Sequence, residues 1–232
     1  MPHTLPDFAA FERLAAANPA RGALLPLFRR LVCDSLTPVL AYRRLVRPDP
    51  RMKPSFLLES VVGGERVGRY SFLGAQPIAE LVAYGDTLRH LDNRDCRNNR
   101  QTTCPDPLAE MARITGGMTL ARIPELPSFT GGWVGCAAYD SVRYLERDKL
   151  GFDAAPRDDR RLPDLHMALY NEVVAFDHVQ KTVLVITHVR PEEHASLRAA
   201  YDHGAAKLRE LVQRLVTPAA APGEAELPAG DV

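Results

Sequence analysis

The spacing of apolar residues along this chain predicts short helices interspersed with antiparallel strands. Apolar side chains recur at helical spacing over residues 8–17, 107–114 and 191–215, and residues 38–46 contain a proline suited to a first helical turn. Hairpins and helices do not alternate regularly, which favours an α+β fold, with antiparallel β-sheets flanked by helices, over a doubly wound parallel sheet. Strands are expected where short apolar runs are bounded by turn residues, at 56–60, 69–73, 78–84, 87–91, 130–140, 169–176 and 182–189.

Turn and loop signals indicate how these elements connect. Gly63-Gly64 is expected to join the first two strands, and Gly85-Asp86 the next pair. Residues 92–105 are polar and irregular, which predicts a surface loop. The last residues are rich in proline, alanine and glycine and cannot bury a core. We therefore expect residues 1–216 to form one folded region and 217–232 a flexible linker or tail.

One predicted strand pair carries the most informative side chains of the chain. Glu59 and Ser60 close the apolar run that begins at Phe56, and Arg69 and Tyr70 open the next run. Two strands joined by a turn bring a carboxylate, a hydroxyl, a guanidinium and an aromatic ring together. This combination suits a small zwitterion with an apolar side chain, such as an amino acid. A structural cross-strand ion pair between Glu59 and Arg69 explains the same residue types without any ligand.

The bulk composition argues against several classes of function. The 232 residues carry 29 basic and 29 acidic side chains, so the net charge of zero gives no general attraction to nucleic acid or to an anionic membrane. No apolar run approaches the roughly 20 residues needed to cross a bilayer. The N-terminus lacks the basic and apolar segments of a secretory signal, so a cytoplasmic location is expected.

Neither a catalytic centre nor a metal site is recognisable in the sequence. No nucleophile–base pair stands out, and the acids between residues 146 and 159 are typical of a solvated loop. The four cysteines form no Cys-x-x-Cys pair. Cys96 and Cys104 lie in a polar segment that also contains His90, Asp92 and Asp95, but their spacing does not match the common structural zinc sites. Free thiols in a loop are expected there, and no metal.

A series of short sequence words follows in a characteristic order. These are Phe56–Ser60 (FLLES), Gly68–Gly74 (GRYSFLG), Asp106–Leu108 (DPL), Phe129–Gly135 (FTGGWVG), Tyr139-Asp140 with Arg143, Leu162–Asp164 (LPD) and Phe176–His178 (FDH). Together they resemble the N-terminal region of anthranilate synthase component I, a chorismate-using enzyme family, and the match extends over about residues 20–190. The related aminodeoxychorismate synthase component I shares a looser version of these words and remains an alternative.

The resemblance implies a fold in which both halves of a longer chain contribute to antiparallel sheets flanked by helices. For the complete enzyme it implies conversion of chorismate to anthranilate and pyruvate, the first step of tryptophan biosynthesis. That reaction uses Mg²⁺ and ammonia from a glutamine amidotransferase subunit. The resemblance also implies feedback inhibition by L-tryptophan, bound partly by the two strands. The matching positions are Leu58, Glu59 and Ser60 on the first strand and Arg69, Tyr70 and Ser71 on the second.

These positions suit an amino acid in the ways that physical chemistry requires. Arg69 can pair with the carboxylate of the ligand through two parallel hydrogen bonds. Glu59 or nearby backbone carbonyls can accept from its ammonium group, and the Ser60 hydroxyl can donate or accept. Leu58 and Tyr70 can line the apolar slot for the side chain.

The sequence departs from the family in one major respect. The catalytic half, with its magnesium-binding carboxylates and chorismate-binding basic residues, has no counterpart here. We therefore expect a truncated regulatory and scaffold part that needs a separate catalytic half and is inactive on chorismate alone. A stand-alone amino-acid-binding module and an inactive remnant remain alternatives. Cys136-Ala-Ala138 also stands where Tyr-x-Gly is more usual, and the segment around Cys96–Cys104 has no counterpart that we can place.

Overall fold

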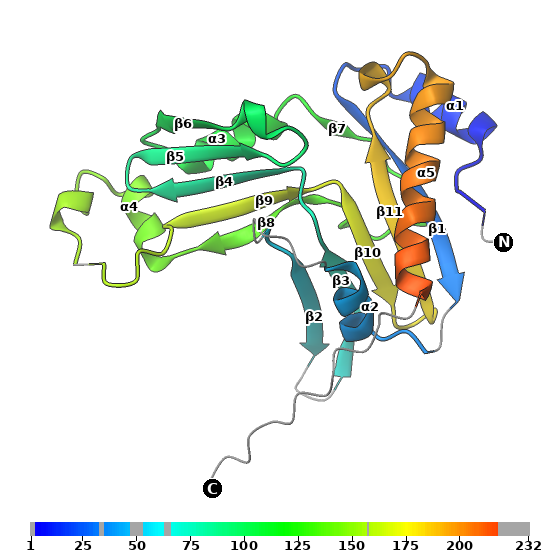
Figure 1. The fold of residues 1–232 in the computed structure, drawn as a ribbon, viewed down its shortest axis with the longest axis horizontal. Helices are drawn as coiled ribbons and strands as arrows, with labels where there is room; N and C mark the ends of the chain where they lie inside the picture. The colour runs from blue at the N-terminus through cyan, green and yellow to red at the C-terminus, as the bar shows by residue number, and fades with distance from the viewer. Residues whose placement is uncertain (1–2, 33–34, 47–52, 63–65, 157, 218–232) are drawn as a thin grey trace, which may run out of the picture.

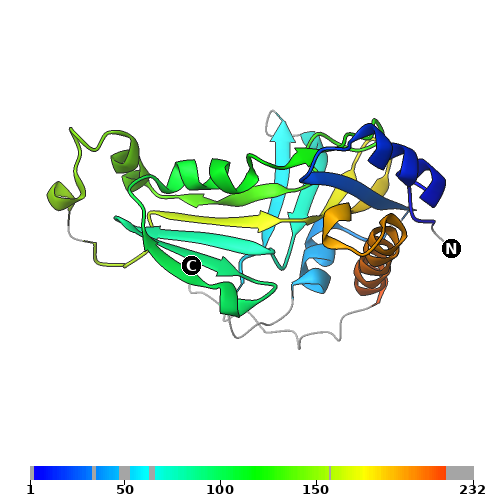
Figure 2. The same ribbon diagram turned by 90° about the horizontal axis from the view of Figure 1, so that it is seen from above.

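Two β-sheets, joined where strand β9 (Leu165–Tyr170) leads into β10 (Glu172–Asp177), organise the protein (Figures 1 and 2). A computed structural model describes residues 3–32, 35–46, 53–62, 66–156 and 158–217. The strands of one sheet run roughly across those of the other in Figure 1. In the part of the chain so described, no helix is long and apolar enough to span a bilayer.

The first sheet has six strands and is covered on one face by three helices. All its neighbours are antiparallel except β1 and β7, which pair in parallel. Helix α5 lies along β11 and β1 (Figure 1), and Phe8 and Phe11 of α1 each place a ring 5.4 Å from that of Tyr201. The sheet order is β2 (Phe56–Val62), β3 (Arg66–Gly74), β10, β11 (Thr182–Val189), β1 (Ala23–Val32) and β7 (Thr119–Leu120), and the helices are α1 (Phe8–Ala17), α2 (Pro38–Leu45) and α5 (Leu197–Val216).

The second sheet has five antiparallel strands, and α3 (Pro107–Thr115) packs against one of its faces. Leu108, Met111 and Ile114 of α3 contact the buried side chains of this face. The short helix α4 (Val142–Leu145) follows β8, and Tyr144 from it joins the same cluster. The sheet order is β6 (Arg100–Thr103), β5 (Thr87–Asp92), β4 (Ala79–Tyr84), β9 and β8 (Gly132–Ala137), and the remaining helical turns are η1 (Cys96–Asn98), η2 (Tyr139–Ser141), η3 (Phe152–Ala154) and η4 (Pro191–Glu193).

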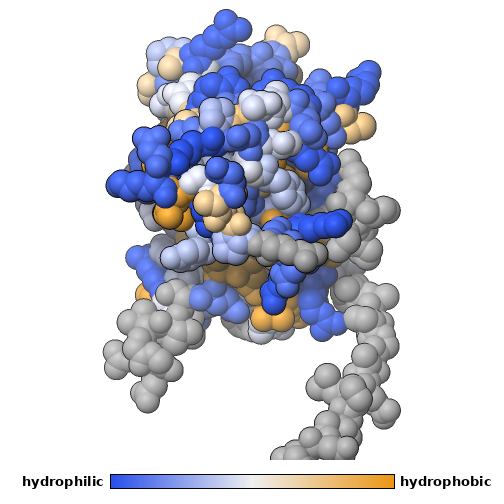
Figure 3. All heavy atoms as spheres, turned by 90° about the vertical axis from the view of Figure 1, so that its left-hand side faces the viewer, coloured by the Kyte–Doolittle hydropathy of each residue, from blue (hydrophilic) through white to orange (hydrophobic). Residues whose placement is uncertain are grey.

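The faces of the two sheets that lack a helix meet at their junction. Aromatic rings fill this corner: Phe56 lies 4.7 Å from Tyr170, and Phe72 lies 5.3 Å from Phe129, both edge-to-face. Figure 3 turns the left-hand side of Figure 1 toward the viewer and shows apolar residues in a recess below a largely hydrophilic surface. We call this surface the inner face; its central residues are Phe56, Phe72, Phe129, Val134, Ala168, Tyr170 and Val173.

Most of the elements predicted from the sequence are confirmed. The α+β class, the helices near residues 8–17, 38–46 and 107–114, and the hairpins β4–β5 and β10–β11 are all present. The predicted turn at 63–64 and the predicted tail from 218 onward lie outside the described residues.

Three sequence predictions were wrong in part. The segment 92–105 is not irregular throughout, because it contains η1 and the edge strand β6. The run 169–176 is not one strand, because Asn171 separates β9 from β10 and the two belong to different sheets. The last helix begins at Leu197 rather than Pro191, because Ser196 supplies the cap by accepting from the Ala199 N–H at 3.1 Å.

Candidate functional site

The six residues predicted to bind an amino acid lie on one stretch of the β2–β3 pair. Leu58 is opposite Phe72 and Glu59 is opposite Ser71, and the pairing shifts register between Glu59 and Val61. Ser60 therefore lies at the irregularity, where it alone on β2 stands against the three residues Gly68 to Tyr70 on β3, so that the pair bends there. The sequence-based prediction that these two strands face each other is confirmed.

The guanidinium of Arg69 is held by an acid that the sequence did not suggest. Its Nε and Nη2 donate to Oδ2 of Asp177 at 3.3 and 3.0 Å, and this hydrogen bonding raises the pKa of Arg69. The Arg69 guanidinium also lies 4.8 Å from the centre of the Tyr70 ring. The Glu59–Arg69 ion pair considered from the sequence is not formed. Neither hydrogen bond to Asp177 uses Nη1.

Ser71 is fully buried and is tied to the residue after Asp177. Its Oγ lies 2.7 Å from Nε2 of His178, and the His178 N–H donates to the Arg69 carbonyl at 2.9 Å. Asp177 and His178 thus connect β10 to both ends of the predicted site on β3. Sequence reasoning missed this role, although the FDH word containing both residues was noticed. The register of β3 against β10 is a long-range pairing that no local pattern specifies.

The strand pair presents groups of different character to solvent. Leu58 keeps 49 % of its surface exposed, and Glu59 is exposed as well. Tyr70 is partly buried, and burial, together with the charge of Asp177, raises the pKa of its phenol. Arg69 retains 53 % of its side-chain surface. Each of these groups is accessible, but Leu58 and Glu59 are neighbours in β2 and point to opposite faces of the sheet.

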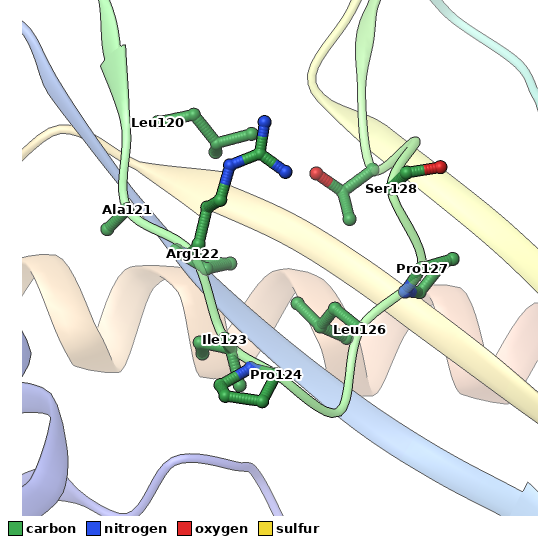
Figure 4. Close-up of a pocket in the computed structure, with 10 residues that line it drawn as sticks. Leu120, Ala121, Arg122, Ile123, Pro124, Leu126, Pro127 and Ser128 are labelled. Atoms are coloured by element: carbon green, nitrogen blue, oxygen red, sulfur yellow. The ribbon is translucent and has the colours of Figure 1, made fainter.

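A cavity of about 460 Å³ opens beside the inner face, within the segment that leads to β8 (Figure 4). Residues from Leu120 to Pro124 form one side of a loop and Leu126 to Ser128 the other, and Arg122 extends beside Leu120. Arg122 has no ion pair among the described residues. The cavity is lined by Pro26, Leu120, Ala121, Arg122, Ile123, Pro124, Leu126, Pro127, Ser128 and Thr130.

Phe72 links this cavity to the predicted site. It lies opposite Leu58 on β2 and also packs with Ile123 and Leu126 of the loop. The cavity walls are mostly apolar, with one guanidinium and two hydroxyls among them. Phe72 therefore places the Leu58 side of the strand pair next to the loop that forms this cavity, while none of the six predicted site residues lines the cavity itself.

The described residues show no group of three histidine, cysteine or acidic side chains that would hold a metal ion. Cys96, Cys104 and Cys136 are free thiols. The shortest acid–histidine contact among the described residues joins β9 to β4: His166 Nε2 lies 2.8 Å from Glu80. Asn93 donates to the same carboxylate at 2.7 Å. Burial opposes ionisation of Glu80, but these two partners prevail and lower its pKa.

Comparison with known proteins identifies anthranilate synthases of plants and bacteria as relatives. The chain is 47 % identical over 204 residues to the chloroplastic anthranilate synthase alpha subunit 1 of Oryza sativa subsp. indica, covering 86 % of this chain and 35 % of that protein. It is 35 % identical over 208 residues to anthranilate synthase component 1 of Pseudomonas aeruginosa, covering 90 % and 39 %. No protein-family model matches the chain.

A solved structure agrees with the sequence relatives. The crystal structure of anthranilate synthase component I from Streptococcus pneumoniae superposes with a TM-score of 0.52 at 25 % sequence identity, covering 82 % of this chain and 37 % of that one. This chain therefore spans little more than a third of the length of the relatives it matches. The plant relatives carry chloroplastic in their names, and the cytoplasmic location expected here stays a prediction. The chain belongs to the anthranilate synthase component I family and corresponds to the N-terminal part of its members.

Proposed function

We propose that this chain is the regulatory and scaffold part of an anthranilate synthase component I. The complete enzyme would convert chorismate and glutamine-derived ammonia to anthranilate and pyruvate, in the first step of tryptophan biosynthesis. The chain would carry part of the L-tryptophan feedback site and would not catalyse the reaction alone. Support comes from the relatives, whose names describe anthranilate synthase and of which this chain matches about a third.

The L-tryptophan half-site would consist of Leu58, Glu59, Ser60, Arg69, Tyr70 and Ser71. The observation that carries this assignment is the β2–β3 pairing, which sets the accessible Leu58 and Glu59 beside the half-exposed Arg69. The ligand ammonium would approach Glu59 and its indole would lie against Leu58. Because Asp177 holds Nε and Nη2 of Arg69, the ligand carboxylate would meet Nη1. Because Ser71 is buried, it would not touch the ligand; it would hold β3 in place through its hydrogen bond with His178.

Catalysis would require the part of the family's longer chains that lies beyond the region matched by this chain. Mg²⁺ belongs to the complete enzyme, and the described residues do not fit it, since no three metal-ligating side chains come together. The partners would be the catalytic C-terminal half and a glutamine amidotransferase subunit. The names alpha subunit and component 1 mark the relatives as parts of multi-component enzymes. Incubation of the purified chain with chorismate, Mg²⁺ and ammonium should release no pyruvate.

Titration calorimetry with L-tryptophan tests the half-site directly. A saturable heat is expected, and Glu59→Gln should weaken binding by about tenfold because a charged acceptor for the ammonium is lost. Glu12→Gln is the matched control, since Glu12 is exposed on α1, away from β2 and β3. Absence of heat up to millimolar ligand, or equal weakening by both variants, would remove the half-site from the proposal.

A further inference from the structure

A second cavity, of about 290 Å³, lies where the two sheets meet α5 and η4. Its residues come from six separate places in the chain, including the ends of β11 and η4 and the middle of α5. It is separate from the β2–β3 pair and from the loop around Arg122, and none of its lining residues belongs to the proposed half-site. The lining consists of Ile78, Arg94, Asn171, Glu172, Thr187, His188, Val189, Arg190, Glu193, His194, His203 and Lys207.

Three cations of this cavity are only loosely paired. Lys207 Nζ lies 4.0 Å from Glu172 and 4.0 Å from Glu210, both beyond hydrogen-bond distance. Arg94 reaches its acids at 3.7 and 3.8 Å, again without a hydrogen bond. Arg190 gives one nitrogen to Glu193 at 3.2 Å and points another at the Met118 sulfur at 3.0 Å, which is a weak acceptor. Strong donors thus remain available around the space.

Two acids share the lining with the three cations. Glu193 lies between Arg190 and Arg94 and serves both guanidinium groups. Glu172 is largely buried at the start of β10, and burial raises the pKa of its carboxyl, which disfavours the negative charge. Within the lining itself, three cations stand against these two acids, while Asp92 and Glu210, which pair with Arg94 and Lys207, lie outside the lining.

Two histidines complete the positive lining. The rings of His194 and His203 lie 5.0 Å apart, one after η4 and the other on α5. Burial, His194 and Lys207 lower the pKa of His203, in that order of importance, and Glu193 opposes them. Nearby positive charge makes protonation of the His203 imidazole less favourable. A bound anion would offset that charge, so His203 would protonate more readily.

We propose that this cavity binds a small oxyanion, a carboxylate or a phosphate, through Lys207, Arg94 and Arg190. Guanidinium and ammonium groups are the donors that proteins use for such anions. A volume of about 290 Å³ admits a small anion together with some water. The loose ion pairs allow the three cations to turn toward a ligand without breaking a tight hydrogen bond at Lys207 or Arg94.

Calorimetry on the full chain, with inorganic phosphate and separately with succinate, tests this site. Saturable binding of at least one anion is expected, and the one that binds identifies the source. Lys207→Gln should weaken it by about tenfold through loss of one charge-assisted hydrogen bond. Lys149→Gln is the matched control, because Lys149 is exposed and pairs with Glu146 in the loop after α4. Equal affinity of the two variants, or no binding of either anion at 10 mM, overturns the proposal.

The pH dependence supplies a second readout that a merely structural lysine would not show. Affinity should increase as the pH falls below about 6.5, because the pKa of His203 is lowered in the free protein, its protonation adds positive charge, and a bound anion favours that protonation. Nuclear magnetic resonance of the histidine rings should show the His203 pKa rising on saturation with the anion. A pH-independent affinity overturns the role of the histidines. The other charged or titratable groups facing them are Arg94, Glu172, His188, Arg190, Glu193 and Lys207.

Discussion

At the scale of single residues, Asp177 does the most to connect separate parts of the structure. Its Oδ1 accepts from the backbone N–H groups of Val179 and Gln180, each at 3.0 Å, and its Oδ2 accepts from Arg69. One carboxylate therefore shapes the turn between β10 and β11 and also positions the guanidinium of the candidate site. Burial opposes ionisation of Asp177, but these hydrogen bonds prevail and lower its pKa.

Asp177→Asn should destabilise the protein by about 1–2 kcal/mol, because the amide keeps one oxygen for the two backbone N–H groups but turns an NH₂ group toward Arg69, so the charge-assisted hydrogen bonds from Arg69 are lost. Urea unfolding at pH 7 measures the change. Since the folded pKa is lowered, the stabilisation is present at neutral pH and is lost as the pH falls through that folded value. Asp202→Asn is the control, because Asp202 forms an exposed pair with Arg198 and should cost under about 1 kcal/mol. Equal losses would contradict the connecting role.

His188 is a buried histidine that the fold keeps neutral. Burial lowers its pKa from 6.5 to about 4, although the Asn171 carbonyl, 3.1 Å from Nδ1, works in the opposite direction. In the unfolded chain the same imidazole protonates near pH 6.5. Unfolding at acidic pH therefore takes up a proton at His188, and stability falls as the pH drops from about 6.5 toward 4.

Replacing His188 by glutamine should remove about 2 kcal/mol of the stability difference between pH 7 and pH 4.5, as follows from the two pKa values. The measurement is the free energy of unfolding in urea at both pH values. The informative quantity is the difference between them, since the substitution also changes packing at every pH. His3→Gln, at an exposed position near the N-terminus, should leave that difference unchanged. An unaltered difference in the His188 variant would disprove a buried neutral imidazole.

At the scale of elements, Gly204 in helix α5 can be explained only from the packing of that helix on the sheet. Gly204 lies mid-helix, where glycine is less favourable than alanine by about 1 kcal/mol. A Cβ at this position would lie 2.5 Å from Leu27 Cδ1 and 2.8 Å from Val189 Cγ1, so the missing side chain lets α5 approach β1 and β11 closely. Sequence reasoning recognised the unfavourable glycine but had no means to see the strands beneath it.

Gly204→Ala is therefore expected to destabilise the protein by about 1–2 kcal/mol, because overpacking exceeds the gain in helix propensity. Ala206→Gly, two positions along at an exposed site of α5, should also destabilise, by about 1 kcal/mol from propensity alone. Thermal or urea unfolding of both variants decides the matter. If the Gly204→Ala protein were more stable, α5 and the strands beneath it would have enough space for the added methyl group.

The sequence predicted those elements whose ends are marked by a few neighbouring residues. It did not predict features that depend on contacts between residues far apart in the chain. Helix α2 begins where Thr37 accepts from the Leu40 N–H and Pro38 follows, which is a signal contained in a few residues. In contrast, the break at Asn171 divides a continuous apolar run between two sheets, and its amide donates to the His188 carbonyl at 2.7 Å. That partner is 17 residues away, so no periodicity within the run marks the break. The same reason hid Asp177 from the predicted site, whose two strands were otherwise identified.

At the scale of the whole molecule, the inner face is the side over which none of the described helices packs. Leu58 is half exposed there, and Cys136 lies in the same row of β8 as Val134, opposite His166 of β9. If the catalytic half of the family completes the fold, it should cover the rim of this surface, where Leu58 keeps 49 % of its surface exposed around the buried aromatic centre. Cys136 and Cys96 are both exposed thiols, but Cys96 lies in η1, away from the inner face.

The two thiols therefore report which surface a catalytic half covers. Maleimide should label Cys136 and Cys96 at comparable rates in the isolated chain, since both are exposed. Adding the C-terminal two-thirds of the rice relative as a separate polypeptide should slow labelling of Cys136 by tenfold or more, about the effect of burying a thiol for nine-tenths of the time, and leave Cys96 unchanged. Mass spectrometry of the labelled peptides measures both rates in one sample. Protection of Cys96 instead, or of neither thiol, would place the missing half elsewhere and would leave the inner face without its expected partner.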